Sequence, residues 1–287
     1  MSYRRRDSPL HATRAGCACC YCLALALAAL MLDNPLLLAA LTLTLLLAGT
    51  GARVGGPLRR TALLTIPLAA AIVVINALVA RDGLHVIIRL GQLPVLGHTD
   101  ITLEATAYGG VLALRGAALI LCGGLYTLAV DPDQVLALFR RVSFHSALTA
   151  TIATRMVPVL ARDSRRLADA QRCRAGSPPS RLALMRAVSS GVLDRALDVA
   201  AALEVRGYGA VRRPPRHRRP WSRHDLAFAA AAFLIAATAI VVRVGGLAAF
   251  HAYPVLRATF GAGTIALAVA LPAIALLPFA DRRGIAR

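Results

Sequence analysis

Six apolar segments divide the chain, and polar stretches separate them. Most of these segments approach or exceed the roughly 20 residues that an α-helix needs to cross a bilayer. The first two are shorter and flank the polar turn Asp33-Asn34-Pro35, which is typical of a helical hairpin. We therefore predict an all-α, polytopic membrane protein with about six transmembrane helices. The segments lie near residues 18–32, 35–49, 61–80, 105–130, 225–243 and 260–280.

The basic residues indicate how these helices are oriented. All 33 are arginine, and they give the chain a formal net charge of +19. If the amino terminus is cytoplasmic, most arginines fall in cytoplasmic loops, as the positive-inside rule requires. We predict a multi-pass cell-membrane protein with both termini in the cytoplasm and the lipid bilayer as its surroundings. The arginines expected outside are Arg81, Arg89, Arg243 and Arg257.

The same charge raises the question of nucleic-acid binding. Proteins that bind single strands interleave basic residues with aromatic ones, on which the bases stack. This chain has 5% aromatic residues and no basic tail of that kind. We therefore expect no nucleic-acid partner.

The longest stretch between apolar segments, residues 131–224, contains the most informative patterns. It separates the predicted amino-terminal helices (1–130) from the carboxyl-terminal pair (225–287). It opens with DPDQ, where Asp131 suits a helix cap and Pro132 the first helical position. We predict a short helix that ends near His145.

Two longer amphipathic helices are predicted next, at about 146–175 and 181–206. In the first, Asp163–Arg166 and Arg165–Asp169 have the spacing of neighbours on one helix face. In the second, apolar residues recur every three or four positions, whereas Asp194, Arg195 and Asp198 lie largely off this stripe. The stripe consists of Met185, Val188, Val192, Ala196, Val199 and Leu203.

Both long helices end with an arginine beside small residues. Arg174 lies in QRCRAG and Arg206 in EVRGYG. Because a guanidinium group pairs with a carboxylate through two hydrogen bonds, two such tips suit a two-point docking surface for acidic grooves. They equally suit ordinary basic helix ends, which the helix dipole and anionic lipid both favour.

With these endings placed after four spans and the DPDQ helix, the chain resembles the transmembrane coupling (T) component of energy-coupling-factor (ECF) transporters. That family includes the cobalt-transport membrane subunit. It carries two Ala-Arg-Gly motifs at the ends of two cytoplasmic coupling helices. The corresponding residues are Cys173-Arg174-Ala175 and Val205-Arg206-Gly207, and the resemblance also includes ITLEATAYGGVLALR, DPDQVLALFRRV and RMVPVLARDSRRLADAQR.

The resemblance implies a role without chemistry of its own. Such subunits join two cytosolic ABC ATPase subunits to a membrane substrate-binding (S) component, in the uptake of a vitamin or a transition-metal ion. Arg174 and Arg206 are then expected to contact the ATPases, with Cys173, Ala175, Val205 and Gly207 allowing a close fit. Neither triplet is intact, because Ala175 replaces a glycine and Val205 is bulkier than alanine.

No cofactor, metal or catalytic residue is expected, because the chain has no Walker A phosphate loop, metal-binding His-Glu helix or nucleophile elbow. An integral membrane enzyme and a stand-alone secondary transporter remain the alternative functions.

Arg115, inside the fourth apolar segment, is expected to pair with a neighbouring helix or to snorkel. The cysteines of CACCYC are either small packing residues or a site for a soft metal or an acyl group. They are Cys17, Cys19, Cys20 and Cys22.

Overall fold

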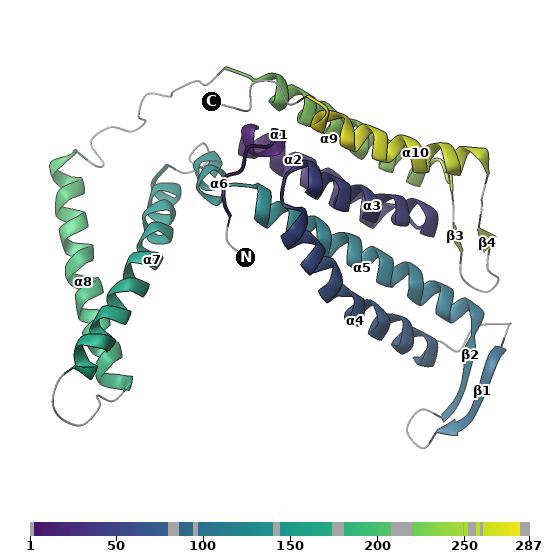
Figure 1. The fold of residues 1–287 in the computed structure, drawn as a ribbon, viewed down its shortest axis with the longest axis horizontal. Coiled ribbons are helices and arrows are strands. Elements are labelled where there is room, and N and C mark those ends of the chain that lie inside the picture. Colours follow the sequence, from purple (N-terminus) through teal and green to yellow (C-terminus); the bar gives the residue numbers. More distant parts are fainter. Residues whose placement is uncertain are drawn as a thin grey trace. The chain divides into compact units, whose positions relative to one another are not determined.

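The computed structural model describes residues 3–79, 86–93, 97–139, 144–173, 181–207, 220–248, 250–251, 257–258 and 261–281. The chain divides into two compact units (Figure 1). Residues 1–132 and 221–287 form the first, which we call the membrane unit. Residues 133–220 form the second, which we call the helical unit.

The apolar segments of the sequence are the helices of the membrane unit. Four of them are long and apolar enough to cross a membrane, judged by length and composition, and α2 and α3 are shorter apolar helices. The prediction of an all-α membrane protein is confirmed. The helices are α1 (Pro9–Ala12), α2 (Ala15–Met31), α3 (Pro35–Gly51), α4 (Gly55–Val79), α5 (Leu103–Ala129), α9 (Arg223–Val244) and α10 (Ala262–Leu276), followed by the 3-10 turn η1 (Leu277–Phe279).

Two short antiparallel hairpins add β structure that the apolar pattern did not predict. Strands β1 (Val86–Leu93) and β2 (Gly97–Thr102) pair between α4 and α5. Strands β3 (Phe250–His251) and β4 (Arg257–Ala258) pair between α9 and α10. Figure 1 shows both hairpins at the ends of these helices, away from the helix bundle itself. They therefore modify two loops and leave the helical class unchanged.

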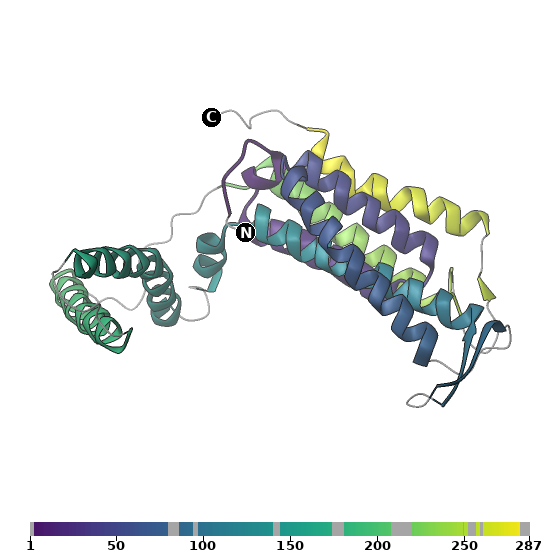
Figure 2. The ribbon, with the colours of Figure 1, turned by 60° about the horizontal axis from the view of Figure 1, so that its bottom comes forward.

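The six apolar helices pack side by side (Figure 2). Helix α5 contacts α2, α3 and α4, whereas α9 packs against α2, and α10 against α3 and α9. Tyr21 of α2 is fully buried among Phe228 of α9 and Phe279 of η1, with the rings edge to face. Its hydroxyl donates to the carbonyl of Ala275 at 2.9 Å. This satisfied phenol ties α2, α9 and α10 together, because an unpaired buried hydroxyl is costly.

Glycine allows α4 and α5 to approach closely. A Cβ atom on Gly109 of α5 would lie 3.0 Å from Cβ of Asn76 and 3.1 Å from Cα of Val73. One of these atoms belongs to the α4 backbone, which cannot move as a side chain does. The neighbouring Gly110 has no such atom within 4 Å.

We therefore predict opposite effects for alanine at these adjacent glycines. Gly109→Ala should lower the free energy of unfolding by about 1–3 kcal/mol, because it overpacks the helix contact. Gly110→Ala should be neutral or stabilise the helix by up to about 1 kcal/mol, because glycine is a poor helix former. Thermal unfolding of the purified protein in detergent measures both. Equal melting temperatures for the two variants would contradict this packing.

The helical unit consists of α6 (Pro132–Phe139), α7 (Phe144–Arg172) and α8 (Arg181–Val205). Pro132 is the first residue of α6, as the sequence predicts. The prediction that this helix reaches His145 is wrong, because His145 already belongs to α7. The two long helices otherwise match the predicted ranges, and α7 continues through Pro158.

One histidine in the membrane unit is buried outside the apolar helices. Nδ1 of His11 in α1 lies 2.6 Å from Oγ of Ser8, and Tyr3 stacks on the ring. Burial lowers the pKa of His11 below its ordinary value of 6.5, partly offset by the backbone of Leu128, with Arg6 and Arg5 lowering it further. The folded protein therefore favours the neutral imidazole.

This burial predicts a pH dependence of stability. Below pH 6.5 the unfolded chain binds a proton at His11 that the folded chain resists, so stability should fall as the pH falls through that value. His11→Asn removes the titrating group and should flatten this part of the profile. Melting temperatures measured between about pH 5 and 8 in detergent test it, since this window brackets the ordinary histidine pKa. Parallel profiles for both proteins would show that His11 does not contribute.

Candidate functional site

The two helix ends that carry the predicted docking residues differ in how much of them the structure describes. Helix α7 ends at Arg172, and the amide of Cys173 still donates to the carbonyl of Asp169 at 3.1 Å. The Cys173 side chain is exposed. Arg174 and Ala175 lie outside the described residues.

The end of α8 is described through Gly207. Val205 is 89% exposed, and Arg206 beside it is also exposed. The amide of Gly207 donates to the carbonyl of Glu204 at 2.9 Å, and its φ is 74°. This left-handed conformation strains residues with a side chain and closes helices at glycine. Gly207 thus ends the helix just after Arg206, leaving the arginine at an exposed tip.

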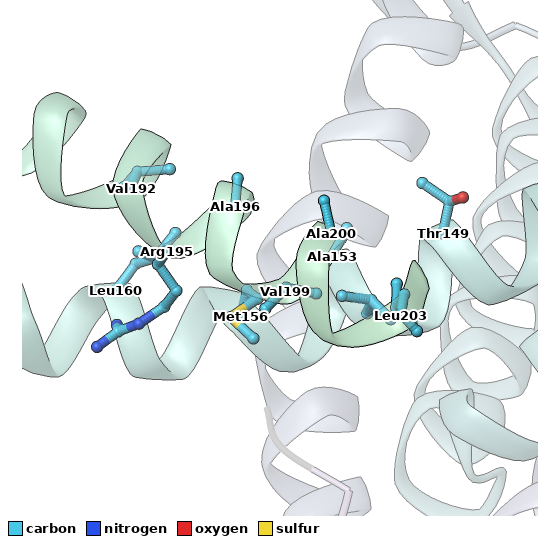
Figure 3. A pocket seen from close by; sticks show the side chains of 11 residues that line it. Thr149, Ala153, Met156, Leu160, Val192, Arg195, Ala196, Val199, Ala200 and Leu203 are labelled. Atoms are coloured by element: carbon cyan, nitrogen blue, oxygen red, sulfur yellow. The ribbon is translucent and has the colours of Figure 1, made fainter. Parts of the chain in front are cut away.

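Helices α7 and α8 face each other across an apolar groove of about 320 Å³. Figure 3 shows side chains from both helices pointing into it. The predicted stripe of α8 is present in this groove for four of its six members, whereas Met185 is 67% exposed. The groove is lined by Thr149, Ile152, Ala153, Met156 and Leu160 of α7 and by Val192, Arg195, Ala196, Val199, Ala200 and Leu203 of α8.

Charged residues on these helices pair differently from the sequence expectation. Asp163 of α7 forms an ion pair and hydrogen bond with Arg195 of α8. Arg195, which was predicted to lie largely off the apolar stripe, therefore lines the groove at the contact between the helices. Asp169 pairs with Arg172, one turn along the same helix, at 3.7 Å. Helical spacing identified possible neighbours of Asp163 along α7. Its partner is instead Arg195, because α8 packs against α7 at this point.

We predict that the Asp163–Arg195 pair holds α7 against α8. The side chains of Arg195 and Asp163 are 41% and 33% exposed, so water screens the pair. It should therefore contribute only about 0.2–1 kcal/mol to the free energy of unfolding. Asp163→Arg should speed hydrogen exchange at the backbone amides of α8, because two arginines then face each other. The exchanged pair Asp163→Arg with Arg195→Asp should restore protection. Asp169→Arg is the matched control, since its pairing stays within α7.

The charge inside the fourth apolar segment has partners. Arg115 of α5 pairs with Asp33 at 2.6 Å and donates to the carbonyl of Leu32 at 3.0 Å. Asp33 also pairs with Arg243 of α9. Arg115 was predicted to pair with a neighbouring helix or to snorkel, and its partners lie in the turn between α2 and α3. The polar turn between α2 and α3 supplies the carboxylate that pairs with this charge.

The cysteines of CACCYC are spread around the first turns of α2. Cys17 and Cys22 are buried, Cys19 is half-buried and Cys20 is exposed. The thiol of Cys122 in α5 donates to the carbonyl of Cys22 at 3.0 Å. Among the residues that the structure describes, no three His, Cys, Asp or Glu side chains are grouped so as to hold a metal ion. The buried members are packing residues between α2 and its neighbours.

Comparison with known proteins identifies the family. Residues 6–217 match the family model CbiQ, cobalt transport protein, which covers most of the chain and includes both helix ends. The chain belongs to the CbiQ cobalt transport protein family. Its apolar helices and its CbiQ membership point to a membrane component of transport rather than to an enzyme.

A second comparison relates the CbiQ chain to an ABC protein. It is 28% identical over 189 residues to a putative ABC transporter ATP-binding protein of Bifidobacterium longum (strain NCC 2705). The match covers 59% of this chain and 23% of that protein, so the CbiQ chain corresponds to about a quarter of the relative's length.

Sequence reasoning missed one polar cluster that the structure assembles. Asp225 at the start of α9 accepts hydrogen bonds from the backbone amides of Arg14 and Ser222. The Arg14 side chain pairs with the same carboxylate at 3.4 Å and lies over the ring of Trp221. The sequence does contain a signal for this cluster. Arg14 directly precedes the first apolar helix and Asp225 lies in the first turn of α9.

Proposed function

We propose that the chain is the transmembrane coupling subunit of an ECF-type ABC importer for a vitamin or a transition-metal ion. In this role it transmits ATP-driven motion from two cytosolic ABC ATPase subunits to a membrane substrate-binding (S) component. The observation that carries the proposal is the exposed Val205-Arg206-Gly207 tip of α8 in a member of the CbiQ family. The relative named as an ABC transporter ATP-binding protein supports the ATPase as partner.

The chemistry of the tip suits such a contact. An exposed guanidinium group at the end of a long helix reaches a groove without burying the rest of the helix. In an acidic groove it forms paired, charge-assisted hydrogen bonds with a carboxylate. Gly207 stops the helix directly behind the arginine and adds no side chain to the contact. Cys173 and Val205 stand beside the two arginines as the apolar neighbours of the proposed contacts.

The packing of α7 on α8 suits the transmission of motion. Apolar residues line the facing sides of both helices, and the Asp163–Arg195 pair joins them. A displacement of one helix can be passed to the other through these contacts. Two tips on one packed pair match two ATPase subunits that close together.

The coupling function requires one particular end of the membrane unit to face the cytoplasm, where the ATPases are. Arg6 donates to the carbonyl of Arg53, and Arg14 pairs with Asp225, so these residues lie at the same end of the membrane unit. Positively charged ends favour the cytoplasm. We propose that this end, with both termini, is cytoplasmic.

Co-purification with the ATPases tests the proposal. The tagged chain is co-expressed with ABC ATPases encoded beside it, and the bound ATPase is quantified after membrane extraction. Arg206→Glu and Arg174→Glu should each weaken retention, because removing one partner of a buried charge pair costs about 2–5 kcal/mol. The double variant should retain no ATPase. Arg206→Lys should be intermediate, because lysine keeps the charge but not the paired donors.

The matched control is Arg186→Glu, which reverses an exposed charge near the other end of α8. It should retain the ATPases as the unchanged protein does. Equal retention by the double variant and the unchanged protein would exclude the docking role of the two tips. A protein that binds no ATPase at all would instead return the stand-alone transporter as the leading function.

A further inference from the structure

The amino-terminal segment, residues 3–14, lies against both places where the chain passes between the membrane unit and the helical unit. We call this segment the clasp. The chain leaves the membrane unit after α5, at Pro132, and re-enters it at Trp221, just before α9. Figures 1 and 2 both show the segment running past the end of α5 before it enters α1.

The contact at the re-entry point centres on Asp225. Its side chain is 3% exposed, and Oδ1 accepts the backbone amide of Arg14 at 2.7 Å. Oδ2 accepts the amide of Ser222 at 2.9 Å, and the Ser222 hydroxyl accepts the amide of Asp225 in return. The guanidinium group of Arg14 pairs with Oδ2 and lies 5.2 Å from the centre of the Trp221 ring. A buried carboxylate with this many donors is held firmly, because each satisfies part of its charge.

The contact at the exit point involves the beginning of the clasp. Tyr3 stacks on His11 with ring centres 5.8 Å apart. Partial burial raises the pKa of Tyr3, and the nearby carboxylate of Asp131 raises it further. The His11 ring is close enough to the backbone of Leu128, near the end of α5, for that group to raise its pKa. Figures 1 and 2 show the beginning of the clasp beside the end of α5, in agreement with these interactions.

Further contacts fix the middle of the clasp. Arg6 donates to the carbonyl of Arg53 in the turn between α3 and α4. Ser8 caps α1, and Leu10 is 1% exposed. Helix α1 packs against α9 and η1. The clasp is thus anchored along its length and not only at its ends.

A second ion pair fixes α9 against α2 at their other end. Asp33 follows α2 and pairs with Arg243 near the end of α9. Helices α2 and α9 run parallel to each other. At their first ends an arginine beside α2 (Arg14) pairs with an aspartate of α9 (Asp225), and at their last ends an aspartate beside α2 (Asp33) pairs with an arginine of α9 (Arg243). A shift of α9 by one turn, about 5.4 Å, would break both pairs. The Asp33–Arg243 pair lies at the far end of α9 from the re-entry point, so the contact that acts directly on that point is the one at Asp225.

We propose that the clasp holds the exit and re-entry points of the chain at a fixed separation, and that Arg14 is its positioning residue. The use of such a device rests on the proposed coupling function. Motion of the helical unit enters the membrane unit through these two connections. If the connections could separate independently, part of that motion would be absorbed between them. A closed clasp passes it to the bundle as a whole.

The distance between the exit and re-entry points is measured by pulsed electron paramagnetic resonance on the full chain in nanodiscs. Spin labels are attached at Pro132→Cys and Arg223→Cys, one beside each connection. The more accessible native cysteines are replaced first, as Cys19→Ser, Cys20→Ser and Cys173→Ala. The unchanged clasp should give one narrow distance distribution. Arg14→Gln should lose this single narrow peak, and Arg14→Lys should restore it, because lysine keeps the charge next to Asp225 and Trp221.

Arg243→Gln is the matched control, since it removes an ion pair from the opposite end of the same helix. It should keep the narrow distribution. A narrow distribution in Arg14→Gln would overturn the proposal, as would equal broadening in Arg14→Gln and Arg243→Gln. Melting temperatures of all variants show whether a broad distribution comes from unfolding.

Trp221, which is the chain's single tryptophan, gives an independent readout. Acrylamide should quench its fluorescence more strongly in Arg14→Gln than in the unchanged protein or Arg14→Lys, because the covering guanidinium group is lost. Unchanged quenching in Arg14→Gln would also overturn the proposal. Retention of the ATPases is measured on the same variants. Arg14→Gln should retain them, so failure of the clasp and failure of the docking function give different results.

Discussion

The buried carboxylate of Asp225 holds the start of α9 against the start of α2, and much of the membrane unit depends on that contact. In an apolar environment an unpaired carboxylate is very costly, so its donors are fixed together with it. They include the backbone of Arg14 and of Ser222. Once α9 is placed along α2, Phe228 meets Tyr21, and Asp33 meets Arg243. Polar groups thus set the register of helices whose apolar surfaces alone would permit sliding.

The helical unit uses the same physical chemistry with a different result. Its long helices meet along an apolar groove, and the Asp163–Arg195 ion pair joins them. Their ends leave Cys173, Val205 and Arg206 exposed. Exposed charge at a helix tip costs little in water and becomes useful only when a partner removes the water. For a member of the CbiQ family, this division separates a compact membrane unit from helices with surfaces available for contact.

Each sequence pattern predicted the features that its own physical constraint governs. Apolar segments of about 20 residues predicted α4, α5, α9 and α10, because the bilayer sets that length. The hairpins β1–β2 and β3–β4 were missed, since short loop strands carry no comparable constraint. Spacing along α7 suggested Arg166 as a neighbour of Asp163. Arg195 is its partner instead, because it comes from a helix whose packing the spacing does not describe.

By itself the sequence determined the helical class, the order of the apolar helices, the positions of the two long helices α7 and α8, and the family resemblance. All of these depend on local periodicity, composition or short motifs, which are written along the chain. Only the tertiary structure decided that Asp33 pairs with Arg115, that Gly109 rather than Gly110 lies against α4, and that residues 3–14 reach Asp225 and the end of α5. These contacts join positions far apart in the sequence, and they arise from helix packing and from the need to pair buried charges.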